Sequence, residues 1–98
     1  MTNPGVTLCV TLRIPSTGLE AFRAYEDAVL PLLASHGGLP QRRLRTETET
    51  VEIHVLWFPS SAQYEAYRAD PRRLAHADLL ATSRATAEIL TVQDIKTG

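Results

Sequence analysis

Apolar and polar residues alternate strictly near the start of the chain. Apolar side chains occupy every second position from Val6 to Ile14, and the positions between them hold Thr7, Cys9, Thr11 and Arg13. A period of two over this length predicts a β-strand with one apolar and one more polar face. Pro15 has no N–H group to donate to a neighbouring strand and is expected to end it.

A helical period replaces this alternation from about Leu19 onward. Thr17 and Glu20 have the spacing of a capping box, which predicts that a helix begins here. Pro31 removes one intrahelical hydrogen bond, so we expect a kink, and Gly37-Gly38 is expected to end the helix. The positions that keep the helical period are Leu19, Phe22, Tyr25 or Glu26, Val29, Leu32, Leu33 and His36.

Two extended runs, residues 41–47 and 50–58, predict a hairpin. Alternate positions of the second run divide into Val51, Ile53, Val55 and Trp57 on one side and Glu52, His54, Leu56 and Phe58 on the other. Because the first set is entirely apolar, we expect it to face the helices. Glu52 and His54 are then expected on the opposite face, beside the polar side chains of the first strand.

The remaining segments carry clear start signals. Ser60 with Gln63 is a second capping box, and Asp70 followed by Pro71 is an N-cap with proline at the first helical position. The helix that restarts there is expected to reach about Arg84, and residues 88–95 predict a last strand. The order βαββαβ, with the second helix broken in two, predicts an α+β fold. We expect a ferredoxin-like antiparallel sheet of order 4-1-3-2 with helices on one face, as one domain over residues 1–98.

Composition and charge exclude several classes of partner. Ten basic and eleven acidic side chains leave a net charge of −1, so no charge excess favours nucleic acid or an anionic membrane. RNA-recognition domains share this topology but need aromatic side chains on the central strands, and the first strand has none. No stretch approaches the roughly eighteen apolar residues of a membrane span, and the N-terminal residues lack a signal-peptide pattern. The cytoplasm is the expected location.

Cofactor signatures are also missing from the sequence. A single cysteine, Cys9, excludes an intramolecular disulfide and a CxxC motif. No histidine pair has helical metal-binding spacing, and the glycines form no phosphate-binding loop. We therefore expect neither a metal nor another cofactor.

Several segments are typical of one superfamily. They are the proline-containing first helix that ends at His36-Gly37-Gly38, the sequence Phe58-Pro59-Ser60, and the stretch from Tyr67 to Pro71. With the βαββαβ order, they make the chain resemble the dimeric α+β barrel superfamily, specifically its DUF1330-like and antibiotic-biosynthesis-monooxygenase-like proteins. The resemblance implies a homodimer whose two sheets face each other across a barrel lumen. It also implies relatives that are cofactor-independent oxygenases, haem-degrading enzymes and isomerases, but it assigns no catalytic residue.

His54 is the candidate catalytic residue, because an imidazole near the centre of a sheet could take a proton from a phenol or a carbon acid. Its alternative role is a structural hydrogen bond to Thr11 or Glu52. Arginine side chains can clamp a carboxylate or an enolate, or they can pair with the glutamates of the hairpin. His36 is interpreted mainly as a helix-terminating residue. The candidate ligand-binding residues are Thr11, Arg13, Arg43 and Arg45.

Three functions remain open at this point. The first is a cofactor-independent oxygenase or isomerase that acts on a small aromatic or carbonyl compound in the barrel lumen. The second is a non-catalytic dimer that binds or senses a ligand. The third is a structural dimer whose lumen is filled. A cavity with converging polar side chains would favour the first two over the third.

Overall fold

The structure is a computed structural model and describes residues 5–95. Residues 1–4, which belong to the N-terminal stretch without a signal-peptide pattern, therefore lie outside the described residues. Four strands, four α-helices and two 3₁₀ segments follow the predicted βαββαβ order: β1 (Val6–Arg13), η1 (Ser16–Gly18), α1 (Leu19–Val29), η2 (Leu30–His36), β2 (Leu39–Arg45), β3 (Val51–Phe58), α2 (Ser61–Arg68), α3 (Pro71–Leu74), α4 (Ala77–Ser83) and β4 (Thr86–Val92).

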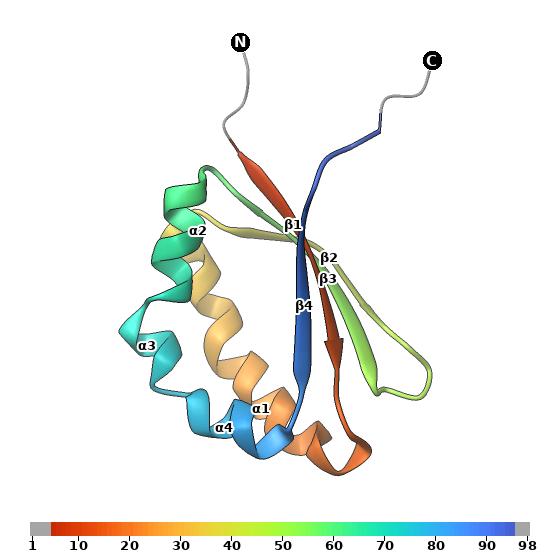
Figure 1. Cartoon of the computed structure of the whole chain (residues 1–98). Coiled ribbons are helices and arrows are strands. Elements are labelled where there is room, and N and C mark those ends of the chain that lie inside the picture. The colour runs from red at the N-terminus through yellow and green to blue at the C-terminus, as the bar shows by residue number, and fades with distance from the viewer. Residues whose placement is uncertain (1–4, 96–98) are drawn as a thin grey trace.

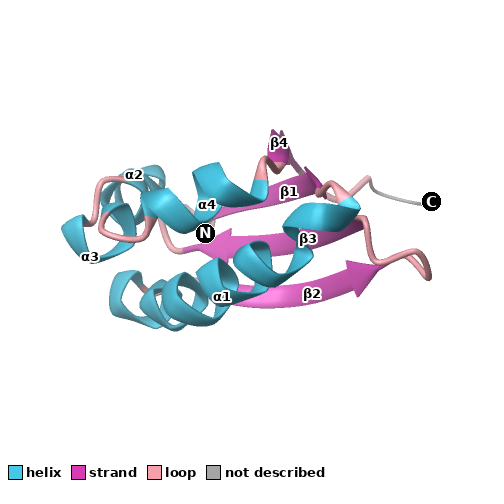
Figure 2. Ribbon diagram, turned by 90° about the horizontal axis from the view of Figure 1, so that it is seen from below, coloured by secondary structure: helices cyan, strands magenta, loops and turns pink. Residues whose placement is uncertain are grey.

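The strands form one antiparallel sheet of order β2-β3-β1-β4, which confirms the predicted ferredoxin-like α+β fold. The helices all lie on the same side of this sheet (Figure 1). Seen from below, α1 and α4 lie side by side against that side (Figure 2). We call the side that the helices cover the helix face, and the other side the open face.

The first helical segment differs from the prediction at its start and at Pro31. No side-chain cap forms at the start of α1, because the chain first makes the 3₁₀ turn η1 and Gly18 takes the N-cap position. Pro31 causes a break rather than a kink: α1 ends at Val29 and the chain continues as the 3₁₀ helix η2. Gly37 ends η2 in the left-handed conformation, with φ 71°, as the glycine pair predicted.

The second helical segment begins as predicted and breaks more often. Ser60 Oγ accepts a hydrogen bond from the N–H of Gln63 at 3.1 Å, and Asp70 Oδ1 accepts one from the N–H of Arg72 at 2.8 Å. The chain then leaves helical geometry at His76, so the segment forms three helices instead of two. Arg84 ends α4 in the left-handed conformation, and β4 starts two residues earlier than expected.

The orientation of β3 was predicted incorrectly. Leu8 and Val10 of β1 face the helices as expected and are buried. Val10 pairs directly with His54, and side chains of paired residues share a face, so His54 also points toward the helices. The second set of β3 side chains therefore lies on the helix face, and the open face holds the set expected under the helices: Val51, Ile53, Val55 and Trp57.

The main core lies between the helix face and the helices. Its buried members come from β1, η2, β3 and α2, and they are Leu8, Val10, Leu33, Leu56, Phe58 and Tyr67. Within residues 5–95, none of the helices combines the length and the apolar character needed to cross a membrane.

Candidate functional site

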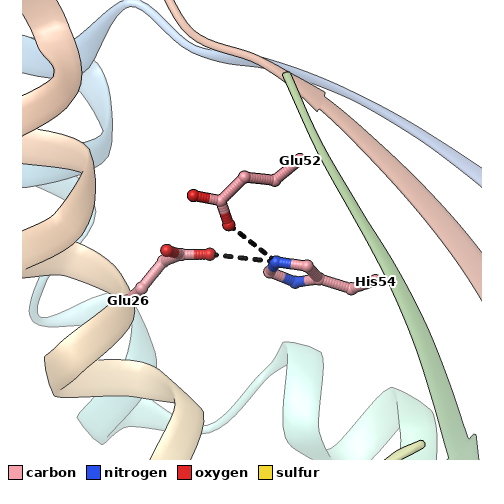
Figure 3. Close-up of side chains that lie close together, drawn as sticks. All are labelled: Glu26, Glu52 and His54. Atoms are coloured by element: carbon pink, nitrogen blue, oxygen red, sulfur yellow. Dashed lines mark hydrogen bonds and ion pairs between the residues drawn. The ribbon is translucent and has the colours of Figure 1, made fainter. Parts of the chain in front are cut away.

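Three ionisable side chains meet in the interior between α1 and β3. Nε2 of His54 lies 2.8 Å from Oε1 of Glu52 and 3.2 Å from Oε2 of Glu26. Figure 3 shows both contacts converging on the same ring nitrogen. Each of the three side chains is at most 5% exposed. We call these residues the acid–histidine cluster.

Local structure explains how the cluster forms. Glu52 and His54 are two residues apart on β3, so both project from the same side of the strand. Glu26 projects from α1 at a helical position that continues the buried series of Phe22 and Val29. The signal for Glu26 in the sequence is therefore a carboxylate at an apolar position of the helical period.

Two arginines of the edge strand β2 balance the buried charge. The β2–β3 register places Arg43 opposite His54 and Arg45 opposite Glu52. A guanidinium nitrogen of Arg43 lies 3.4 Å from Oε1 of Glu26, and Nε of Arg45 lies 3.1 Å from Oε2 of Glu52. Both arginine side chains remain accessible to solvent at the outer edge of the cluster, so their charges are partly screened.

The two carboxyl groups differ in protonation. Burial, followed by a hydrogen bond to Glu52 and the repulsion of its charge, raises the pKa of Glu26 to about 8. Burial would also raise the pKa of Glu52, but hydrogen bonds from Glu26, His54 and Arg45 outweigh this effect and lower it. At neutral pH the cluster thus combines a carboxylic acid at Glu26 with a carboxylate at Glu52.

The imidazole of His54 is neutral in this environment. Burial lowers its pKa, and the hydrogen bond to Glu52 opposes that shift only in part. Since an ionised Glu52 has no proton to donate, Nε2 of His54 must carry the hydrogen in their 2.8 Å contact. The remaining lone pair of the neutral ring is therefore on Nδ1, which leaves that nitrogen able to accept a proton.

A cavity of about 130 Å³ adjoins the cluster between the sheet and the helices. Glu26 and His54 line it together with aromatic side chains that include Tyr64 and Tyr67. An apolar cavity of similar size accommodates a single benzene ring in another protein. A mostly apolar pocket with a few converging polar groups is the usual form of a small-molecule site.

The predicted site residues divide between the two faces of the sheet. His54, Arg43 and Arg45 come together, but on the helix face instead of the expected open face. Thr11 pairs with Ile53 and Arg13 with Val51, so both lie on the open face, away from the cavity. The separation follows from the β1–β3 register, since residues with opposite parity along a strand project to opposite faces.

His36 lies outside the cavity but has a more specific contact than its position in the sequence indicated. Its Nε2 is 2.8 Å from Oδ2 of Asp70, the residue that caps α3. Asp70 also accepts two hydrogen bonds from the side chain of Arg72. Hydrogen bonds from Arg72 and then from His36 hold the pKa of Asp70 well below its usual range.

The acid–histidine cluster is also the part of the described chain that could hold a metal ion. One oxygen of each carboxyl group and a ring nitrogen of His54 all lie within 4.8 Å of one another. Carboxylate and imidazole ligands suit several divalent transition metals. Arg43 and Arg45 contact the same two carboxyl groups, so the cluster has cationic partners without an ion. The expectation that no metal is needed stays a prediction.

Sequence comparison finds no relatives: no family model matches the chain, and no curated protein is similar to it. Solved structures, in contrast, are similar along nearly its whole length. SnoaB, a cofactor-independent oxygenase from Streptomyces nogalater, has a TM-score of 0.78 at 17% identity, covering 96% of both chains. A protein from Caulobacter crescentus, proposed to be an antibiotic biosynthesis monooxygenase, has a TM-score of 0.73 at 13% identity, covering 94% of this chain and 92% of its own.

A protein of unknown function from Agrobacterium tumefaciens, of the nipsnap family, has a TM-score of 0.68 at 16% identity, covering 98% of this chain and 95% of its own. Identities this low establish a common fold. The chain therefore shares the ferredoxin-like α+β fold of the antibiotic-biosynthesis-monooxygenase-like proteins, and the resemblance inferred from its sequence is confirmed at that level.

Proposed function

We propose that this chain is a cofactor-independent enzyme that removes a proton from a small aromatic or carbonyl compound bound in the cavity beside His54. The observation that carries the proposal is the pairing of a neutral imidazole with one protonated and one ionised carboxyl group at an apolar cavity. Sites that catalyse proton transfer commonly contain neighbouring groups whose pKa values are shifted apart.

Each member of the cluster has a distinct role in the proposed reaction. Nδ1 of His54 takes the proton from an O–H or C–H group, and the electron pair stays on the ligand as a phenolate or an enolate. The carboxylate of Glu52 holds Nε2–H and stabilises the imidazolium that forms. The carboxylic acid of Glu26 can return a proton in an isomerase. In an oxygenase, the carbanion would instead form a C–O bond with dioxygen, the oxidant, and take back the proton as a hydroperoxide, which loses water to leave a carbonyl group. The fold shared with SnoaB supports the oxygenase.

The proposed ligand site differs in position from the one expected from the sequence. That expectation placed the ligand in a lumen between two facing sheets. Here the cavity and His54 lie between the sheet and the helices of a single chain. A second copy is therefore not needed to supply the groups that act on the ligand.

We also propose that the chain forms a homodimer through the open face. This face carries Val51, Ile53, Val55 and Trp57 on β3, and exposed apolar side chains continue it on both edge strands, at Leu39, Leu44, Leu90 and Val92. A sheet face of this composition is costly to leave in water. The resemblance to dimeric barrels supports a second copy of the chain as the occupant.

A non-catalytic binding protein is the second candidate function. The contacts of Arg43 with Glu26 and of Arg45 with Glu52 favour it, because buried polar groups that already have partners can serve structure alone. Binding without chemistry would then be expected. A structural dimer is less consistent with a cavity beside the cluster.

The distinguishing experiment measures proton exchange directly. Enolisable single-ring aromatic ketones such as acetophenone are incubated with the protein in D₂O, and NMR follows deuterium incorporation next to the carbonyl, while an electrode follows oxygen uptake. We expect catalysed exchange, reduced by roughly 10²–10⁴-fold in His54→Gln, as is typical when a general base is removed. His76→Gln, outside the cavity, is the matched control. Binding with no exchange and no oxygen uptake would establish the non-catalytic alternative, and absence of binding would refute both.

A further inference from the structure

Two buried polar atoms lack hydrogen-bond partners, and both belong to residues that line the same cavity. Among residues 5–95, the buried side-chain atoms without a partner are Oε2 of Glu26 and Nε of Arg73. Such atoms are rare in folded proteins, because each one loses its hydrogen bonds to water without replacement. The cavity thus offers an unused donor from α3, Nε of Arg73, and a carboxyl oxygen from α1, Oε2 of Glu26, that lies 3.2 Å from Nε2 of His54 without a hydrogen bond to it.

Arg73 is held in place without being neutralised. Its guanidinium lies over the ring of Tyr67, 5.1 Å from the centroid, and is hydrogen-bonded to the Tyr67 side chain, while a terminal nitrogen lies 3.4 Å from the carbonyl oxygen of Arg68. Within the described chain it forms no ion pair with a carboxylate, unlike Arg23, Arg43, Arg45, Arg68 and Arg72. Stacking on an aromatic ring fixes a guanidinium and leaves its N–H groups available to an anion.

Apart from these polar groups, the cavity is lined mainly by apolar and aromatic side chains. Leu8, Val10 and Leu56 from the sheet and Tyr64 and Tyr67 from α2 line the cavity. Its volume of about 130 Å³ is of the order needed for a single ring. A ligand that fills the cavity and pairs with these polar groups needs an anionic group for Arg73 and an O–H group for Glu26 and His54.

We propose that the cavity selects single-ring aromatic acids that carry a hydroxyl group, with the carboxylate bound by Arg73 and the hydroxyl hydrogen-bonded to Oε2 of Glu26. This inference rests on the proposed function, in that it uses the same cavity, and it adds the class and orientation of the ligand. The hydroxyl group then lies beside His54, which accepts a proton in the proposed reaction.

The test compares three ligands by isothermal titration calorimetry: 4-hydroxybenzoate, its neutral methyl ester and phenol. Wild-type protein is expected to bind the acid at least tenfold more tightly than the ester, since a charge-assisted arginine contact is lost in the ester. Arg73→Gln should remove this preference and leave the affinity for phenol unchanged. Arg23→Gln, which removes an exposed arginine that does not line the cavity, is the control and should keep the preference.

The outcomes separate this inference from the function on which it rests. If phenol and the ester bind as tightly as the acid, or if Arg73→Gln keeps the preference for the acid, the carboxylate site is refuted and the proton-transfer proposal stands. If none of the three compounds binds, the assignment of hydroxylated aromatic acids is refuted, and the deuterium-exchange experiment decides the proton-transfer proposal separately. Circular dichroism of each variant confirms that a lost preference does not come from unfolding.

Discussion

Nε2 of His36 lies 2.8 Å from Oδ2 of Asp70, so the last turn of η2 is bonded to the residue that caps α3. The contact joins segments that are 34 residues apart in the chain. The ring of His36 also meets the edge of Tyr67, with centroids 6.1 Å apart. His36 thus connects the end of η2 to the start of α3.

Replacing His36 by alanine is expected to lower stability without affecting ligand binding. The change removes a charge-assisted hydrogen bond and the contact with Tyr67, and His36 does not line the cavity. We expect a decrease in the melting temperature on the order of 5 °C, measured by differential scanning calorimetry. Arg68→Ala, which breaks an exposed ion pair with Glu65, is the comparison and should change it much less. Loss of ligand affinity in folded His36→Ala would contradict this assignment.

Stability should depend on pH through Glu26. Its folded pKa, about 8, is above the value of 4.5 for an ordinary glutamate, so folding favours the protonated form. The stabilisation from protonated Glu26 is complete at pH values below the ordinary pKa of 4.5. It is lost as the pH rises through the folded-state pKa of about 8, and the free energy of unfolding falls by at most ~1.4 kcal/mol per pH unit. Glu26→Gln cannot ionise, so its stability relative to the wild type should increase from pH 5 to pH 8.

Urea denaturation at pH 5, 6.5 and 8 measures this trend. Glu65→Gln, at an exposed position of α2, should run parallel to the wild type over the same range. A constant difference between Glu26→Gln and the wild type would show that Glu26 is ionised throughout.

Glu52 is expected to be the most sensitive member of the cluster for folding. Its carboxylate accepts hydrogen bonds from His54 and Arg45, so Glu52→Ala leaves a buried imidazole and an arginine without their partner. Breaking a buried pair costs about 3–5 kcal/mol, and we expect about 3 here, since Arg45 is partly solvated. Equilibrium denaturation gives the value, and Glu47→Ala, on the exposed hairpin turn, is the control. A loss below about 1 kcal/mol would mean that solvent replaces these contacts.

The open face can be tested with two leucines of similar exposure. Leu90 is 50% exposed on the open face, and Leu74 is 54% exposed on α3. If two copies pair through the open face, Leu90→Asp buries an unpaired charge in the interface and should produce monomers, whereas Leu74→Asp should not. Light scattering after size-exclusion chromatography at micromolar concentration reports the mass. A monomeric wild-type protein, or dimers of both variants, would exclude this interface.

Much of the fold could be predicted because its signals are local. The alternation in residues 6–14, the glycine at position 37 and the caps at Ser60 and Asp70 each act within a few residues, and the structure confirms them. The capping box at Thr17 failed, because a 3₁₀ turn occupies the same residues. Its final residue, Gly18, lies so close to the backbone of Ser83 that a side chain would collide with it, a long-range contact that local spacing does not reveal.

The site was harder to predict because its geometry depends on pairing between distant strands. One side of β3 is entirely apolar and the other is half apolar, and the entirely apolar side lies on the open face. Hydrophobicity therefore favoured the wrong orientation, and only the pairing of Val10 with His54 decides it. The same error placed His54 on the open face, although its side chain is only 5% exposed.

The alternation along β3 also bears on how the chain selects one strand register. A shift of β3 by one residue against β1 would bring Ile53 and Val55 under α1 and turn Glu52 and His54 outward. Because both sides of the strand can join an apolar layer, hydrophobic burial distinguishes weakly between these two arrangements. The buried carboxyl group of Glu26 favours the native register, because it contacts His54 and Glu52 only in that pairing. Buried polar groups that add little stability relative to apolar side chains of the same size can thus select a single strand alignment. A fully apolar interior at these three positions would leave the sheet with two competing alignments.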